Sequence, residues 1–342
     1  MVGIREVAKK AGVSPGTVSR VLNQDASLTV TKETRQKIMA AVEFFGYEKK
    51  ERSKRTVATI GIVTSVTKIN EWDDPYFRNI RIGMEKEAKR AHLRIENVYR
   101  LPQNPKLEGI GKLGAVLVIG QVDEQLLEEI YRQNRNVVII DDARASKKFD
   151  TVYSDLKEAT NAHLDRLYQM GHRRIVFIGG FRRIRSNNGS EIIKYDDVRH
   201  MAYLNWMKRQ QLEEYSSAFI GDWTTLEGMR LGKAFLAAYQ DKQLPTAIVV
   251  GSDPMAVGVY RALQEKNIRI PEDISIVSYD NIEVAEFLTP SLSTVNIETE
   301  EIGALGVRMA AEKIQGIRCV PVRINVPGTI IVRESERACK KK

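Results

Sequence analysis

The sequence predicts an α/β protein built from two parts: an all-α helix-turn-helix head and a two-lobed, doubly wound α/β core. Residues 4–46 show three short helical patterns separated by glycine and turn residues. Positive charge is concentrated in residues 1–56, which hold +6 of the chain's net charge of +9. From Val57 onward, apolar runs alternate with amphipathic stretches, a pattern typical of parallel sheets covered by helices.

The composition fits a folded protein rather than a disordered or membrane-spanning one. With 43% hydrophobic and 28% charged residues, 342 residues suffice for two or three compact units. No apolar run approaches the roughly 20 residues that cross a bilayer, and residues 1–6 lack a signal-peptide pattern, so we expect a cytoplasmic protein. Cys319 and Cys339 have no metal or redox spacing and are expected to be free thiols.

The first predicted helix covers residues 4–11. Gly3 is its expected N-cap, Glu6 is placed to reach back to that cap, and Gly12 ends the helix. The second predicted helix covers residues 15–22, with Ser14 as N-cap. Pro15 occupies the first position of that helix, where its missing N–H costs nothing.

The third predicted helix begins at Thr31 and stops at Gly46. The first two helices are joined by a three-residue turn containing Gly12, which is typical of a helix-turn-helix. The three helices are expected to share a small core formed by Ile4, Val7, Ala8, Ala11, Val18, Val21, Leu22, Ile38, Ala41, Val42 and Phe45.

The second helix is expected to present Gly16, Thr17, Ser19 and Arg20 to the major groove of DNA. Arg20 can contact a guanine edge with two hydrogen bonds, a contact typically worth about 1–3 kcal/mol of discrimination. The hydroxyls of Thr17 and Ser19 suit phosphate oxygens, which position a helix without reading sequence. The alternative is a generic three-helix cap whose Arg20 is only solvated.

Residues 11–23, Ala-Gly-Val-Ser-Pro-Gly-Thr-Val-Ser-Arg-Val-Leu-Asn, closely resemble the signature of the lactose/galactose-repressor (LacI/GalR) family. The resemblance implies a DNA-binding transcription regulator. The residues of this segment expected to lie at DNA are Ser14, Pro15, Gly16, Thr17, Ser19, Arg20 and Asn23.

Residues 49–56 form an apolar-free basic linker between a head of residues 1–48 and the core. The resemblance implies a hinge helix with a leucine wedged into the minor groove, but only Leu28 occurs between Asn23 and Leu93. We therefore hypothesise that linker cations take this role by holding phosphates or entering a narrow groove, namely Lys49, Lys50, Arg52, Lys54 and Arg55.

The core is predicted to span residues 57–335, followed by a basic tail at 336–342. Its expected strands are Val57–Thr64, Gly114–Gly120, Val137–Asp141, Arg174–Gly180, Thr246–Ser252 and Ile274–Tyr279. Its expected helices are Phe77–His92, Leu156–Met170, Val198–Lys208, Leu226–Tyr239 and Met255–Glu265.

Several core segments resemble the same family, in the same order along the chain. They include residues 74–77 (Asp-Pro-Tyr-Phe), 171–175 (Gly-His-Arg-Arg-Ile), 252–258, 279–281 and 288–295. The resemblance implies a periplasmic-binding-protein-like core with a ligand in the cleft between two lobes, and pairing of two chains through their cores. We expect the first lobe at about 57–158 and 293–318, and the second at about 159–292 and 319–335.

Residues expected to bind the effector match ligand-facing positions of the family or lie where strands end, namely Phe77, Asp141, Arg199, Asp222, Trp223 and Asp253. Other roles stay open for several of them. Asp253 could cap the helix that follows it, and Arg199 could pair with Asp196 or Asp197. Trp223 and Phe77 could be core residues.

Carboxylates, planar donors and an aromatic face are what a sugar requires, so a carbohydrate effector is expected. No nucleophile, phosphate-binding or metal-binding motif occurs, so we expect neither an enzyme nor a metal or cofactor. The sequence thus indicates a repressor of sugar utilisation genes, acting as a dimer on a pseudo-palindromic operator and released by a sugar inducer. A regulator answering to a partner protein and a solute-binding protein of the transport class are the alternatives.

Overall fold

The computed structural model describes residues 3–22, 25, 28–47, 58–67, 71, 75–103, 105–185 and 192–339. The chain forms two compact units, Met1–Thr56 and Val57–Lys342. None of the helices in these described ranges has the length and apolarity needed to cross a membrane.

The first unit contains three helices, α1 (Ile4–Ala11), α2 (Pro15–Leu22) and α3 (Lys32–Phe45). The predicted caps are confirmed: Glu6 hydrogen-bonds the N–H of Gly3, and Gly12 adopts the left-handed conformation with φ +69°. The buried core matches the expected apolar positions except at its edge, where Ile4, Leu22, Val42 and Phe45 are only partly buried.

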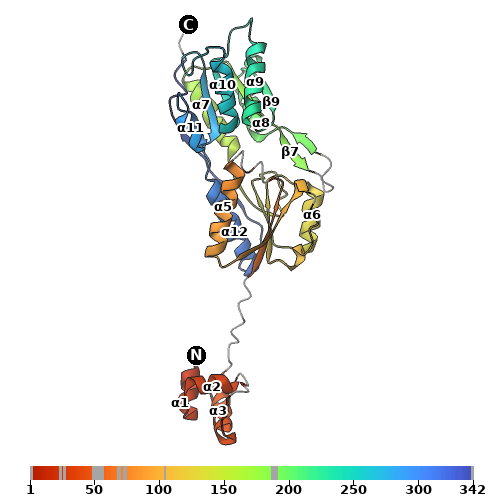
Figure 1. Ribbon diagram of the computed structural model, residues 1–342, viewed down its shortest axis with the longest axis vertical. Helices are drawn as coiled ribbons and strands as arrows, with labels where there is room; N and C mark the ends of the chain where they lie inside the picture. The colour runs from red at the N-terminus through yellow and green to blue at the C-terminus, as the bar shows by residue number, and fades with distance from the viewer. Residues whose placement is uncertain are drawn as a thin grey trace. The chain divides into compact units, whose positions relative to one another are not determined.

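The first lobe of the second unit is a parallel sheet in the order β13-β5-β4-β3-β1-β2. Its strands are β1 (Thr59–Thr64), β2 (Arg94–Arg100), β3 (Ala115–Ile119), β4 (Val137–Ile140), β5 (Asp150–Ser154) and β13 (Arg323–Val326). Helices α5 (Pro75–Arg90) and α12 (Thr299–Ile314) cover one face, and α6 (Glu124–Gln133) covers the other (Figure 1).

The second lobe is a sheet in the order β14-β12-β11-β10-β6-β9, parallel except for β14. Its strands are β6 (Ile175–Gly180), β9 (Ser217–Gly221), β10 (Ala247–Val250), β11 (Ser275–Asp280), β12 (Ser293–Asn296) and β14 (Thr329–Ile331). The helices that accompany it are α7 (Leu156–Gln169), α8 (Val198–Arg209), α9 (Thr225–Ala238), α10 (Asp253–Gln264) and α11 (Glu283–Phe287). A two-stranded hairpin, β7 (Arg182–Arg185) and β8 (Ile192–Tyr195), lies between β6 and α8 and projects from this lobe (Figure 1).

The lobe boundaries differ from the prediction at two strands. We expected residues 293–318 in the first lobe, but β12 pairs with β11 in the second sheet. We expected residues 319–335 in the second lobe, but β13 pairs with β5 in the first sheet. The expected boundaries change lobe at about 159, 293 and 319, and the chain changes sheet after β5, after β12 and after β13, so the last two changes come later than expected.

Glycines let helices approach closely in both lobes. A Cβ on Gly303 of α12 would lie 2.0 Å from the Ile80 carbonyl oxygen of α5, and one on Gly258 of α10 would lie 2.0 Å from the Thr225 carbonyl oxygen of α9. A side chain at either position would overlap the backbone of the neighbouring helix, so these helix pairs depend on glycine.

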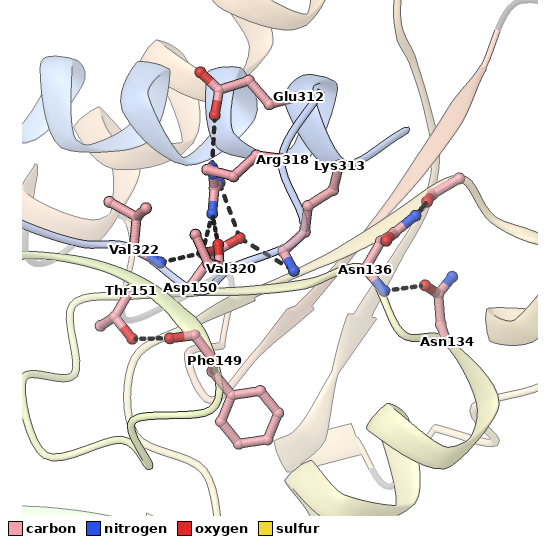
Figure 2. Close-up of polar contacts among 11 residues, drawn as sticks. Asn134, Asn136, Phe149, Asp150, Thr151, Glu312, Lys313, Arg318, Val320 and Val322 are labelled. Atoms are coloured by element: carbon pink, nitrogen blue, oxygen red, sulfur yellow. Dashed lines mark hydrogen bonds and ion pairs between the residues drawn. The ribbon is translucent and has the colours of Figure 1, made fainter. Parts of the chain in front are cut away.

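A fully buried carboxylate, Asp150, ties three elements of the first lobe together (Figure 2). Its two oxygens accept from Arg318 at 2.6 and 3.1 Å, and the Val322 N–H donates to it at 2.6 Å. The Lys313 ammonium lies 3.3 Å away, and Arg318 also binds Glu312 at 2.9 Å. These contacts hold the end of α12 against the first residue of β5 and the segment leading to β13.

Candidate functional site

The start of α2 is exposed, and the hydroxyl groups of Ser14 and Thr17 hold its first turn in place. Ser14 Oγ accepts from the Thr17 N–H at 3.0 Å and lies 2.9 Å from Thr17 Oγ1, which confirms the predicted N-cap. Ser14, Pro15 and Gly16 are exposed, whereas Thr17 and Ser19 are partly buried. The N-terminal turn of α2 is therefore accessible to a large partner.

Arg20 is held at the surface by a neighbouring acid. Its Nε donates to Asp25 Oδ2 at 2.7 Å, and the Arg20 side chain is 47% exposed. Exposed ion pairs of this kind contribute little to stability, so a guanine or phosphate could take the place of Asp25 at small cost. The remaining residues expected at DNA lie outside the described residues, namely Asn23, Lys49, Lys50, Arg52, Lys54 and Arg55.

On the first lobe, Asp141 follows β4 and accepts a hydrogen bond from the Tyr76 hydroxyl at 2.7 Å. The Phe77 ring, at the start of α5, lies edge-to-face on Tyr76 with centroids 5.1 Å apart and is partly buried. Burial raises the pKa of Asp141 from 3.8 to about 7, although the Tyr76 hydrogen bond and the charge of Arg199 oppose that rise. Asp141 therefore changes charge near neutral pH.

Arg199, in the first turn of α8, belongs to the second lobe. Its Nε and Nη2 donate to the two oxygens of Asp197 at 2.6 and 3.1 Å, and its Nη1 donates to the Gly251 carbonyl at 2.8 Å. Burial disfavours the charge, but Asp197 outweighs it, so the pKa of Arg199 is raised. The structure thus shows the ion pair with Asp197 that the sequence left open, and Arg199 is fixed in place by it.

Trp223 lies under this guanidinium. The Arg199 guanidinium carbon is 4.3 Å from the centroid of the Trp223 ring, and the indole N–H donates to the Phe181 carbonyl at 2.9 Å. A Cβ on Gly180 would come within 2.4 Å of the indole, so the ring lies flat against the end of β6. Asp222, directly before it, is half-buried. Trp223 is therefore an ordered aromatic surface at the strand ends.

Asp253 is fully buried rather than open to the cleft. Its oxygens accept from the Ile282 N–H at 3.0 Å and the Thr294 hydroxyl at 2.8 Å. Helix α10 has Ser252 at the N-cap position, so the capping role considered for Asp253 is wrong. Burial raises the pKa of Asp253 to about 7, while Thr294 opposes the rise. In this conformation Asp253 joins α10 to β12.

Sequence patterns did not single out Asp142 and Arg182. Arg182, the first residue of β7, donates from Nη2 to both oxygens of Asp142 at 2.8 and 2.9 Å, across the two lobes. Asp142 follows Asp141 in the chain, and two acids directly after a buried strand are the one signal that could have drawn attention to it. Nothing in the sequence pairs it with an arginine of the hairpin.

The expected effector residues thus gather at the carboxyl ends of the strands of both sheets, the usual ligand position in open α/β sheets. Acidic groups outnumber cations among the described residues there, namely Asp141, Asp142, Asp155, Asp197, Asp222 and Asp280 against Arg144, Lys157, Arg182 and Arg199. An uncharged ligand that hydrogen-bonds through hydroxyls suits this balance better than an anion does. No group of three His, Cys, Asp or Glu side chains in the described ranges could hold a metal ion.

Two family patterns match the chain. Residues 3–49 match the pattern described as bacterial regulatory proteins, lacI family, and residues 164–336 match the periplasmic binding protein-like domain. The HTH-type transcriptional repressor MelR of Bacillus subtilis (strain 168) is 34% identical, over 98% of this chain and 97% of the relative. GanR, an HTH-type transcriptional regulator of the same organism, is 33% identical over 98% and 99%.

Solved structures share the fold over nearly the whole chain. A lac repressor dimer bound to operator and the anti-inducer ONPF superimposes with a TM-score of 0.67 at 22% identity, covering 98% of this chain and 99% of the other. A complex of the regulator CelR with cellobiose gives a TM-score of 0.66 at 24% identity, covering 98% and 100%. These likenesses confirm the predicted fold class of a helix-turn-helix head and a two-lobed α/β core.

Proposed function

We propose a function from one premise: the chain belongs to the lacI family of bacterial regulatory proteins. It is a transcription regulator with a DNA-binding head, and its relatives are regulators rather than enzymes. We propose further that it represses sugar utilisation genes in the cytoplasm. Two chains bind a pseudo-palindromic operator through α2, and a neutral sugar in the cleft releases them.

The observations that carry the sugar assignment are the fixed guanidinium of Arg199 over Trp223 and its charge interaction with Asp141 of the other lobe, where it opposes the rise in pKa that burial causes. A fixed guanidinium and a carboxylate from opposite lobes can clasp adjacent hydroxyls, since a hydroxyl both donates and accepts hydrogen bonds. The partly exposed Trp223 indole, stacked with the Arg199 guanidinium, supplies an apolar edge beside these polar groups for the C–H surface of a sugar ring. The excess of carboxylates disfavours sugar phosphates and sugar acids, so we propose a neutral sugar, with galactosides first.

The coupling to DNA follows from the two-lobed core. A ligand that contacts both lobes stabilises one arrangement of them, and it shifts operator affinity only as far as it prefers that arrangement. Coupling of about 1–3 kcal/mol, or roughly 5- to 150-fold in affinity, is typical of such systems. We propose that the sugar favours the arrangement with weaker operator binding.

Titration calorimetry with paired sugars tests the assignment of the site. We expect neutral hexoses or their glycosides to bind, while the matching sugar phosphates and uronic acids bind at least tenfold more weakly. Arg199→Lys keeps a charge beside Asp197 but cannot make the same set of contacts, so it should lose at least tenfold in affinity. Arg230→Ala, which removes a 62% exposed arginine of α9, is the matched control and should bind like the parent.

Two results contradict the assignment. Tighter binding of the anionic sugars would show that the charge balance of the cleft does not select the ligand. Equal sugar affinities for the Arg199→Lys variant and the parent would place the sugar elsewhere. If no sugar binds but operator binding is intact, the regulator answers to another effector, such as a partner protein.

A further inference from the structure

A second set of polar groups adjoins the one formed by Trp223 and Arg199. A pocket between the lobes is lined on one side by Asp141, Asp142 and Ser154 and on the other by Arg182 and Val198. Asp141 connects the two sets: the charge of Arg199 opposes the rise that burial causes in the pKa of Asp141, and Asp141 also lines this pocket. The two sets of groups therefore adjoin at Asp141.

Arg182 and Asp142 come from different lobes and form an ion pair in the wall of this pocket. Their side chains are 7% and 8% exposed, so the ion pair is almost completely removed from water. Burial lowers the pKa of Arg182, and Asp142 opposes that change. Because the pair costs desolvation at both ends, packing alone does not explain a charged contact at this position.

The geometry of the pair leaves the buried Nε–H of Arg182 without an acceptor among the described residues. Arg199 places Nε and Nη2 on the Asp197 carboxylate and Nη1 on the Gly251 carbonyl, so each of its nitrogens has a partner and one N–H on each of Nη1 and Nη2 remains for a ligand. Arg182 uses Nη2 alone for both oxygens of Asp142, and its Nε is buried without a hydrogen-bond partner among the described residues. Buried guanidinium N–H groups are normally paired, so this donor marks a position for an oxygen that a ligand would supply.

We propose that Arg182 and Asp142 form a second sugar subsite and that the effector is a neutral disaccharide or longer oligosaccharide. One ring lies at Trp223, Arg199 and Asp141, and the next ring lies at the hairpin, with a hydroxyl that accepts from Arg182 Nε and donates to Asp142. The proposal rests on the proposed function of the cleft. It gives the β7–β8 hairpin a role, because β7 carries the arginine that closes over the second ring.

Titration calorimetry on the full chain tests this subsite with galactose and glucose as single rings and with melibiose, lactose and cellobiose as double rings. The parent is expected to bind at least one disaccharide ten or more times more tightly than either monosaccharide. Arg182→Ala and Arg182→Lys should both lose at least tenfold for that disaccharide and less than threefold for the monosaccharide. The lysine variant preserves a charge opposite Asp142 but has no Nε–H donor.

Arg230→Ala is the control, and circular dichroism with operator binding establishes that each variant is folded. If the disaccharide advantage survives in both Arg182 variants, or if monosaccharides lose as much affinity as disaccharides, the second subsite is wrong while the sugar-binding function stands. If the parent binds monosaccharides as tightly as disaccharides, the subsite is also wrong. If the parent binds none of the five sugars, the proposed function fails and the subsite fails with it.

Discussion

Removing the carboxylate of Asp150 should destabilise the core strongly, although no ligand contact is proposed for this residue. In Asp150→Ala, Arg318 and Lys313 lose the acid that they share, and the Val322 N–H loses its acceptor (Figure 2). The side chains of Arg318 and Lys313 are only 15% and 12% exposed, so water can compensate them only in part.

The size of the effect follows from these contacts. Breaking a buried ion pair by removing one partner typically costs about 3–5 kcal/mol, because a charge is left uncompensated. The partial exposure of Arg318 and Lys313, and the Glu312 contact that Arg318 keeps, place Asp150→Ala in the lower half of that range, at about 3–4 kcal/mol. At typical urea m-values such a loss lowers the midpoint of unfolding by on the order of 1 M.

Urea denaturation followed by tryptophan fluorescence measures this loss. All three tryptophans, Trp72, Trp206 and Trp223, belong to the core rather than the head, so their fluorescence reports the core alone. Glu312→Gln is the matched control: it removes a 45% exposed partner of Arg318 and should cost less than about 1 kcal/mol. A loss below 1 kcal/mol for Asp150→Ala, or one equal to that of the control, would refute the reasoning.

Three further predictions follow from the fold and the site. Gly303→Ala should lower core stability by about 1–3 kcal/mol, because its Cβ would overlap the Ile80 carbonyl; an unchanged urea midpoint would show that α5 and α12 can separate freely. The pKa of Asp141 is raised to about 7, so the stability that its protonated form contributes is present below about pH 4 and is lost as the pH rises through 7. In urea titrations, the stability of Asp141→Asn relative to the parent should therefore increase between pH 5 and pH 8. A difference that stays constant with pH would contradict this. Arg20→Ala should weaken operator binding by about 1–3 kcal/mol in anisotropy titrations, whereas Arg94→Ala, which removes a 64% exposed arginine of the core, should leave it unchanged; equal losses would mean that Arg20 acts only through its charge.

The head could be predicted almost completely from the sequence because local chemistry determines it. Caps at Gly3, Ser14 and Thr31 and left-handed glycines at 12 and 46 fix the ends of its helices within a few residues. Six of the buried parallel strands could also be predicted, since strands covered on both faces read as continuous apolar runs, whereas β5 and β12, with their polar residues, could not.

Other elements escaped prediction for identifiable reasons. Strand β2 lies at a sheet edge, and most of its residues are exposed, so it lacks both a continuous apolar run and a regular alternation. Helix α12 contains Gly303 and Gly306, which weaken a helical signal but are required where α12 meets its neighbours. The packing of α12 against its neighbours explains these glycines, whereas helix propensity does not.

The candidate cleft was likewise predicted only in part. Arg199 and Trp223 could be named because they match family positions, but the partner of Arg199 was left open between two acids, and the burial of Asp253 under Thr294 was not foreseen. The contact between Asp142 and Arg182 depends on how the two lobes meet. No pattern in the neighbouring residues shows how the lobes meet, so this contact could not be predicted.

The central claim is that a neutral sugar in the cleft controls DNA binding by the head. Fluorescence anisotropy with DNA from upstream of the protein's own gene, with and without a panel of galactosides and other neutral sugars, tests it most directly. We predict tight, salt-sensitive binding that at least one sugar weakens about 5- to 150-fold in the parent but not in Arg199→Lys. Operator binding that no neutral sugar changes would contradict the claim.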